Sequence, residues 1–96
     1  MYLRVSRGRF DPSSYDEVLA VVQGATAIRR QPGFQNSCWG VDQASGALIA
    51  VSTWDTQEQA GFSRAAVIPP DDAHLMGDAG LQLDAPEVYE IVARQS

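Results

Sequence analysis

The hydrophobic pattern changes along the chain from a period of two residues to a helical period and back, in an order that few folds accommodate. Residues 2–10 alternate, with Leu3 and Val5 on one face and Arg4 and Ser6 on the other. Alternation of this kind is typical of a strand with one buried face. The chain therefore begins with a predicted strand.

A helix is predicted over about residues 12–30. Asp11-Pro12 offers an N-cap and a proline in the first turn, and Ser14 with Glu17 forms a capping-box pattern. The apolar side chains that follow recur at steps of three and four and form one stripe: Tyr15, Val18, Leu19, Val22, Ala25 and Ile28. Pro32-Gly33 then ends the helix and turns the chain.

The middle of the chain is a predicted β-hairpin. Residues 34–42 and 47–54 both have strand-like composition, and Gly46 between them can supply the positive φ of a tight turn. The hairpin places its two strands side by side and antiparallel.

A second helix is predicted to begin at Asp55-Thr56, because Gln59 follows Thr56 at capping-box spacing. It is expected to continue to Ala65, before Pro69-Pro70 breaks it. Residues 71–79 can form a further short helix, and a strand rich in Val, Ile and Tyr is expected over 87–93.

The predicted order is thus βαββαβ in one domain, residues 1–96. Right-handed crossovers then give an antiparallel sheet with both helices on one face, a ferredoxin-like α+β fold. Yet Leu48-Ile49-Ala50-Val51 is apolar on both faces, and the chain has no spare helix. A chain this short hides only about 60 to 65% of its unfolded surface. We therefore predict a homodimer through the sheet face, although single exposed apolar residues on a monomer are the alternative.

Composition argues against a nucleic-acid or membrane partner. The net charge is −5, and the 7 basic residues are all arginine. Arg4, Arg7 and Arg9 form a basic strand without the interleaved aromatics of a phosphate-binding track. No segment approaches the roughly 18 to 20 apolar residues of a membrane span. The N-terminus lacks a secretory pattern, and Cys38 is the only cysteine, expected to be a small buried residue; both favour a cytoplasmic protein.

Three short motifs resemble the antibiotic biosynthesis monooxygenase family. They are Gln31-Pro32-Gly33-Phe34, Val51-Ser52-Thr53-Trp54-Asp55-Thr56 and Val88-Tyr89-Glu90-Ile91-Val92. The resemblance spans almost the whole chain and implies a dimeric α+β barrel. It also implies small oxygenases that act on planar phenolic or polyketide-like compounds without metal or flavin, in a pocket between helices and sheet.

Other members of that family bind and cleave haem. Their pattern requires an Asn on the first strand, a Trp at the end of the third strand and a His on the second helix. Trp54 fits, but the first strand has no Asn, and His74 lies after Pro69-Pro70. These two departures from the pattern argue against haem chemistry. The chain also lacks a two-His metal spacing and a Gly-rich phosphate loop, so no metal or other cofactor is predicted.

Trp54, His74 and Asn36 are the candidate catalytic residues. Trp54 could stack on a planar substrate or simply pack the sheet against a helix. His74 titrates near neutral pH, with plain solvation as the alternative. Asn36 is expected on the same face as Phe34 and Cys38, where its amide could hold a ligand oxygen.

The predicted ligand-binding residues are Arg4, Ser6, Trp39, Phe62 and Tyr89. Either Arg4 or Arg7 could neutralise a phenolate, depending on which face lines the site. Tyr89 is preferred to Glu90, since neighbouring strand residues point to opposite faces. Three functions stay open: a cofactor-independent monooxygenase, a non-catalytic dimer that binds a small ligand or has a structural role, and, behind these two, haem binding.

Overall fold

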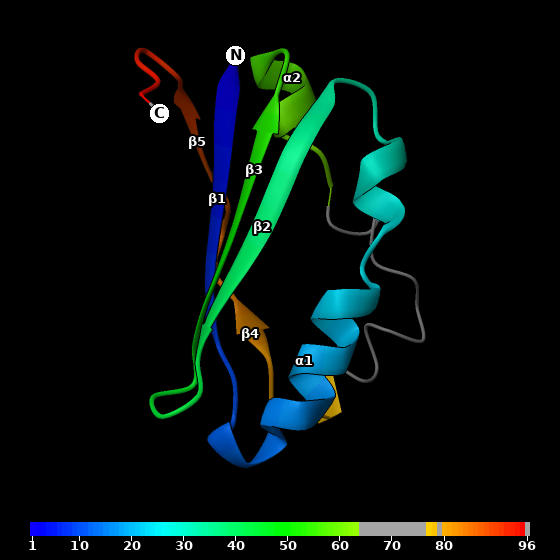
Figure 1. Ribbon diagram of the computed structural model, residues 1–96, viewed down its shortest axis with the longest axis vertical. Coiled ribbons are helices and arrows are strands. Elements are labelled where there is room, and N and C mark those ends of the chain that lie inside the picture. The colour runs from blue at the N-terminus through cyan, green and yellow to red at the C-terminus, as the bar shows by residue number, and fades with distance from the viewer. Residues whose placement is uncertain (64–76, 79, 96) are drawn as a thin grey trace.

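The structure, a computed structural model, describes residues 1–63, 77–78 and 80–95 (Figure 1). Within these residues one sheet contains five strands: β1 (Tyr2–Arg9), β2 (Phe34–Asp42), β3 (Ala47–Trp54), β4 (Gln82–Leu83) and β5 (Glu87–Glu90). Beside the sheet, the described part of the chain includes the helices α1 (Tyr15–Gly24) and α2 (Gln57–Ala60), and residues 77–78 are also helical. The chain is therefore α+β, with the predicted hairpin formed by β2 and β3.

Every strand pairing is antiparallel, and the order across the sheet is β2-β3-β1-β4. β5 also pairs with β1, on the stretch from Tyr2 to Val5, whereas β4 pairs with Gly8 and Arg9. The C-terminal part of the chain thus returns beside the first strand, as a ferredoxin-like fold requires. The predicted fold class is confirmed.

The two faces of the sheet differ in what covers them. Phe10 and Leu48 form a buried cluster with Val18 of α1, which defines the helix side of the sheet. Arg4 and Ser6 share that side, as the predicted alternation requires. The opposite face, called the open side below, carries Leu3, Val5, Arg7, Asn36, Cys38, Gly40, Ile49, Val51, Thr53, Glu87 and Tyr89.

The start of the first helix differs from the prediction. Pro12–Ser14 forms a 3-10 helix, and Asp11 caps it by accepting the Ser13 N–H at 2.9 Å. Ser14 makes no side-chain capping bond, so the expected capping box with Glu17 is wrong. Ser14 lies in the 3-10 turn with a φ of −100° and a ψ of 18°, and not in the extended conformation that a capping residue adopts.

The first helix also breaks before its expected end. α1 stops at Gly24, and the chain resumes as a 3-10 helix over Ala27–Arg30. Glycine costs about 1 kcal/mol in a helix relative to alanine, and nothing lies within 4 Å of a Cβ built on Gly24. Neither propensity nor packing therefore holds the helix together at this residue.

The N-cap of α2 is as predicted, but the helix is shorter than predicted. Thr56 Oγ1 accepts the Gln59 N–H at 3.2 Å. The helix then ends at Ala60, so Phe62 lies beyond it and not within it. The short helix expected over 71–79 lies mostly outside the described residues.

The last strand is shorter than predicted and has a separate segment, β4, before it. β5 ends at Glu90, after which the Ile91 N–H still donates to the Met1 carbonyl at 2.9 Å. Residues 91–95 form no strand in the described part of the chain. Pro86, which has no N–H to donate, separates β4 from β5.

Candidate functional site

On the helix side, the three long strands present their side chains in rows across the sheet. From one end to the other, the rows are Tyr2, Trp54 and Phe34; Arg4, Ser52 and Ser37; Ser6, Ala50 and Trp39; Gly8, Leu48 and Val41. The first row is aromatic and the last is mostly branched and apolar. Apart from Trp39, the side chains of the two middle rows are small or polar. These middle rows form the candidate site.

Trp54 closes one end of the middle rows. It is fully buried, and its ring lies 5.6 Å from the Phe34 ring and 4.8 Å from the Phe62 ring, centroid to centroid. Its indole Nε1 donates to the Ser52 hydroxyl at 2.8 Å. Both the apolar body and the polar atom of Trp54 are thus satisfied within the chain, as packing requires. Contact of Trp54 with a substrate stays a prediction.

Arg4 is a buried charge, with only 4% of its surface exposed. Its Nη1 donates to the carbonyls of Ala60 at 3.0 Å and Phe62 at 2.6 Å. Its Cζ also lies 3.7 Å from the centre of the Phe62 ring, in a cation–π contact. Arg4 therefore binds the carbonyl end of α2, where backbone acceptors lack helical partners and a cation is favoured.

Ser6 occupies the next row and is 7% exposed. No hydrogen bond joins its hydroxyl to another described residue, but the hydroxyl is not completely buried: in the described part of the chain, the buried side-chain polar atom without a partner is Gln59 Oε1. A hydroxyl that keeps some access to solvent needs no partner within the chain and is free to hydrogen-bond water or a ligand. In the same row, Trp39 is half-buried and packs against the apolar cluster. The small Ala50 separates Ser6 from Trp39.

Asn36 does not join these residues. A register shift between Phe34 and Asn36 leaves one extra residue, Gln35, in β2. A bulge of this kind reverses the alternation, so Phe34 faces the helix side while Asn36 lies opposite Thr53 on the open side. The expectation that Asn36 and Phe34 share a face is wrong.

Tyr89 also lies away from the middle rows. It pairs with Leu3 on the open side and is 51% exposed, whereas Glu90 pairs with Tyr2 on the helix side. The preference for Tyr89 over Glu90 is therefore wrong for a site between helices and sheet. The Tyr89 hydroxyl donates to Glu87 Oε1 at 3.0 Å. This hydrogen bond, the Glu87 charge and slight burial raise the pKa of Tyr89, against a smaller opposing effect of Arg7.

The structure separates the two candidate arginines. Arg4 is on the helix side, while Arg7 is on the open side, where its side chain is 63% exposed and pairs with Glu87 at 3.4 Å. Cys38, expected to be buried, is exposed on the open side, because neither α1 nor α2 packs there. His74 lies outside the described residues.

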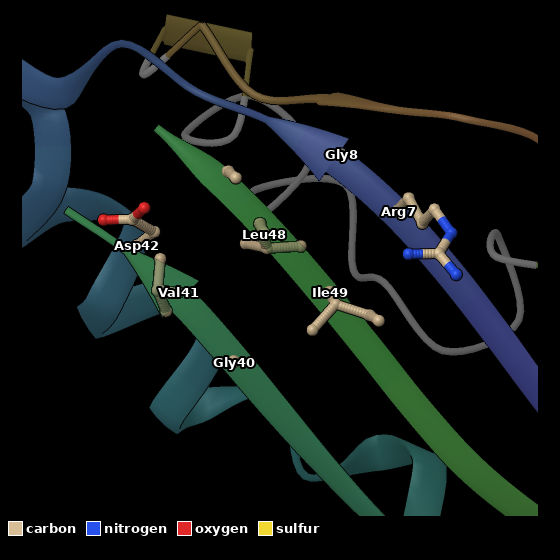
Figure 2. A pocket seen from close by; sticks show the side chains of 8 residues that line it. Arg7, Gly8, Gly40, Val41, Asp42, Leu48 and Ile49 are labelled. Atoms are coloured by element: carbon tan, nitrogen blue, oxygen red, sulfur yellow. The ribbon is translucent and has the colours of Figure 1, made fainter. Parts of the chain in front are cut away.

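The open side also has a hollow of about 390 Å³ (Figure 2). Its lining residues are Arg7, Gly8, Gly40, Val41, Asp42, Ala47, Leu48 and Ile49. It forms where Gly40 leaves β2 without a side chain opposite Ile49. Sequence reasoning missed this hollow, although a glycine inside a strand is the signal that could have indicated it.

Other features are absent from the described part of the chain. There, no three residues of the His, Cys, Asp and Glu types lie close enough to hold a metal ion. No helix in that part is long and apolar enough to cross a membrane. Cytoplasmic location stays a prediction.

Comparison with known proteins supports the fold. No family model matches the chain, and no curated protein matches it. Among solved structures, a candidate antibiotic biosynthesis monooxygenase from Deinococcus radiodurans has a TM-score of 0.70 at 13% identity, over 100% of this chain and 97% of that one. SnoaB from Streptomyces nogalater, described as a cofactor-independent oxygenase, has a TM-score of 0.59 at 19% identity, over 99% and 94%.

A dimeric ferredoxin-like protein from an uncultured marine organism has a TM-score of 0.71 at 8% identity, over 100% of this chain and 99% of that one. Identities this low define the fold and leave the reaction open. The chain has the fold of the antibiotic biosynthesis monooxygenases, so the predicted resemblance is confirmed at the level of the fold.

Proposed function

We propose that this chain, one domain over residues 1–96, is a cofactor-independent oxygenase that binds a planar aromatic or polyketide-like compound over the middle rows. The main support is the position of Ser6 on the helix side, where its hydroxyl keeps some access to solvent and makes no hydrogen bond within the described residues. The ring of Trp39 lies in the same row, beyond Ala50. A flat phenolic molecule over Ala50 would stack on the ring and hydrogen-bond the hydroxyl.

In this proposal the protein itself supplies no electrons to the reaction. The phenolic compound itself supplies the electrons that reduce oxygen, so the chain has to bind it, favour its phenolate and exclude water. The buried guanidinium of Arg4, one row from Ser6, provides a positive potential where the phenolate forms. His74 is the proposed proton acceptor.

Oxygen uptake measured against a panel of hydroxylated polycyclic phenols tests this function. A substrate that supports uptake should also bind, and Ser6→Ala should weaken its binding by about fivefold to tenfold, the effect of one lost hydrogen bond. Asn36→Ala is the matched control, because it removes a polar group from the open side. Equal effects of both variants, or no uptake with any compound, would contradict the proposal.

A non-catalytic ligand-binding dimer is the second candidate. It is favoured by the satisfied surroundings of Trp54, whose ring and Nε1 both find partners within the chain. Tight binding of a phenol without oxygen uptake would select this function. Loss of turnover in His74→Ala with unchanged binding and thermal stability would exclude it.

Under either function, we propose that a second copy of the chain covers the open side. Leu3, Ile49 and Val51 are only half-buried there, and Cys38 is exposed. The name of the marine ferredoxin-like structure describes that protein as dimeric, which agrees with this proposal.

A further inference from the structure

We propose that Tyr89 of the partner subunit enters the hollow beside Gly40 when two copies pack through their open sides. This inference rests on the homodimer proposed above and specifies how the two sheets fit together. In this proposal the hollow is the receptor, and the group that binds in it is a tyrosine that lies far from the middle rows.

The projecting group is Tyr89. Its side chain stands on the open side at the outer edge of the sheet, next to Leu3, and half of its surface is exposed. The hydrogen bond from its hydroxyl to Glu87 restricts its orientation. A large exposed aromatic side chain with few rotatable bonds is the kind of residue that anchors interfaces.

The receptor is the hollow, which lies on the same face of the sheet. Figure 2 shows Arg7 on β1 and Ile49 on the neighbouring β3 beside the hollow, with Gly40 on β2. A Cβ at Gly40 would lie 3.1 Å from Ile49 Cγ2, so any other residue there would begin to fill the space. The lining is mainly apolar, which suits an aromatic ring.

Tyr89 and the hollow lie at diagonally opposite ends of the open side. Along the strands, Tyr89 is level with Leu3, and Gly40 is level with Ile49 and Arg7. Across the sheet, β5 and β2 lie on opposite sides of the central β1 and β3. A two-fold axis over the centre of the face exchanges the two positions, so both contacts form at once.

The same axis brings apolar groups together at the centre of the interface and opposite charges together away from the centre. It runs diagonally to the strands over Val5 and Val51, the middle of the face, and makes the two sheets cross at a steep angle, as in orthogonal sheet packing. It also brings Arg7 toward Glu87 of the partner subunit. In the proposed interface, the hollow would receive the aromatic ring, and Arg7 and Glu87, which already pair within one chain, would face groups of opposite charge.

Disulfide trapping tests the contact. Gly40→Cys and Tyr89→Cys are each made in a Cys38→Ser background, and the two chains are co-expressed and oxidised. Within one chain the two positions are about 20 Å apart by strand spacing, too far for a disulfide. A covalent dimer containing one chain of each kind is therefore expected only if Tyr89 of the partner subunit meets the hollow.

Glu90→Cys replaces Tyr89→Cys as the matched control, since Glu90 is the next residue and faces the helix side. It should give little cross-linking. Ile49→Cys, which also lines the hollow, serves as a second receptor variant if Gly40→Cys does not fold. Tyr89→Ala, without any cysteine, is expected to weaken dimerisation at least about tenfold.

Two results would overturn the inference, and they differ in meaning. A dimer that forms without cross-linking at Gly40 or Ile49, and without any effect of Tyr89→Ala, removes this docking geometry but leaves the homodimer. A protein that stays monomeric removes both.

Discussion

Arg4 shows how a residue that looks like a ligand group can be needed for the fold. Its guanidinium is buried and joins the carbonyls of Ala60 and Phe62 to the sheet. Arg4→Met would leave these acceptors without the cation, so we expect a loss of about 2 to 4 kcal/mol in the free energy of unfolding. Urea unfolding at fixed protein concentration measures it.

The control is Arg9→Met, which changes an exposed arginine of the same strand and should alter stability by less than about 0.5 kcal/mol. Equal effects at Arg4 and Arg9 would show that the buried contacts do not stabilise α2.

Tyr89 should titrate late. Its pKa is raised above the usual value near 10, mainly because its hydroxyl donates to the Glu87 carboxylate. A group with a raised pKa in the folded state contributes stability below the unfolded pKa, and this is lost as the pH rises through the folded pKa. Stability should therefore fall slightly above about pH 10.

Ultraviolet titration of the phenolates, with Tyr89→Phe to assign the signal, measures this pKa. Glu87→Gln should return it toward the usual value. An early titration of Tyr89 in the unchanged protein would show that the hydrogen bond to Glu87 does not form.

At the scale of elements, the turn before β2 depends on one glycine. Gly33 has a φ of 79°, and a Cβ there would run into the Gln59 side chain at the start of the chain's second helix. We expect Gly33→Ala to destabilise the fold by about 1 to 3 kcal/mol. Gly24→Ala is the contrast: it adds a methyl group in open space at the end of α1 and should stabilise by about 0.5 to 1 kcal/mol. Thermal unfolding of the pair checks the opposite signs.

An element could be predicted from the sequence where its cause lies within a short stretch of residues. The alternation of β1 and the hairpin turn at Gly46 are local signals, and the sequence predicts both correctly. The bulge at Gln35 arises from pairing with β3, which a sequence does not display. Alternation alone therefore predicts the wrong face for Asn36.

The candidate site was predictable in part for the same reason. Arg4 and Ser6 follow from alternation, and the structure adds Ser52 and Ala50, which only the register of β3 against β1 brings to them. The face that Tyr89 occupies could be predicted only from the pairing between β5 and β1. Alternation shows that neighbouring residues lie on different faces, but not which face is covered by the helices.

At the scale of the whole molecule, the open side makes Cys38 a natural reporter. It is the only thiol, and it is exposed on a single chain. In the proposed homodimer it is covered, so its rate of reaction with a thiol reagent should fall at least about tenfold as protein concentration rises through the dissociation constant. A rate independent of concentration, in a sample shown to be dimeric, would place the interface elsewhere.

The central claim is that the open side of the sheet meets a second copy of the chain. Light scattering coupled to gel filtration, over micromolar concentrations, tests it most directly. The account predicts a particle of two chains, twice 10.4 kDa. A particle of 10.4 kDa across that range would contradict it.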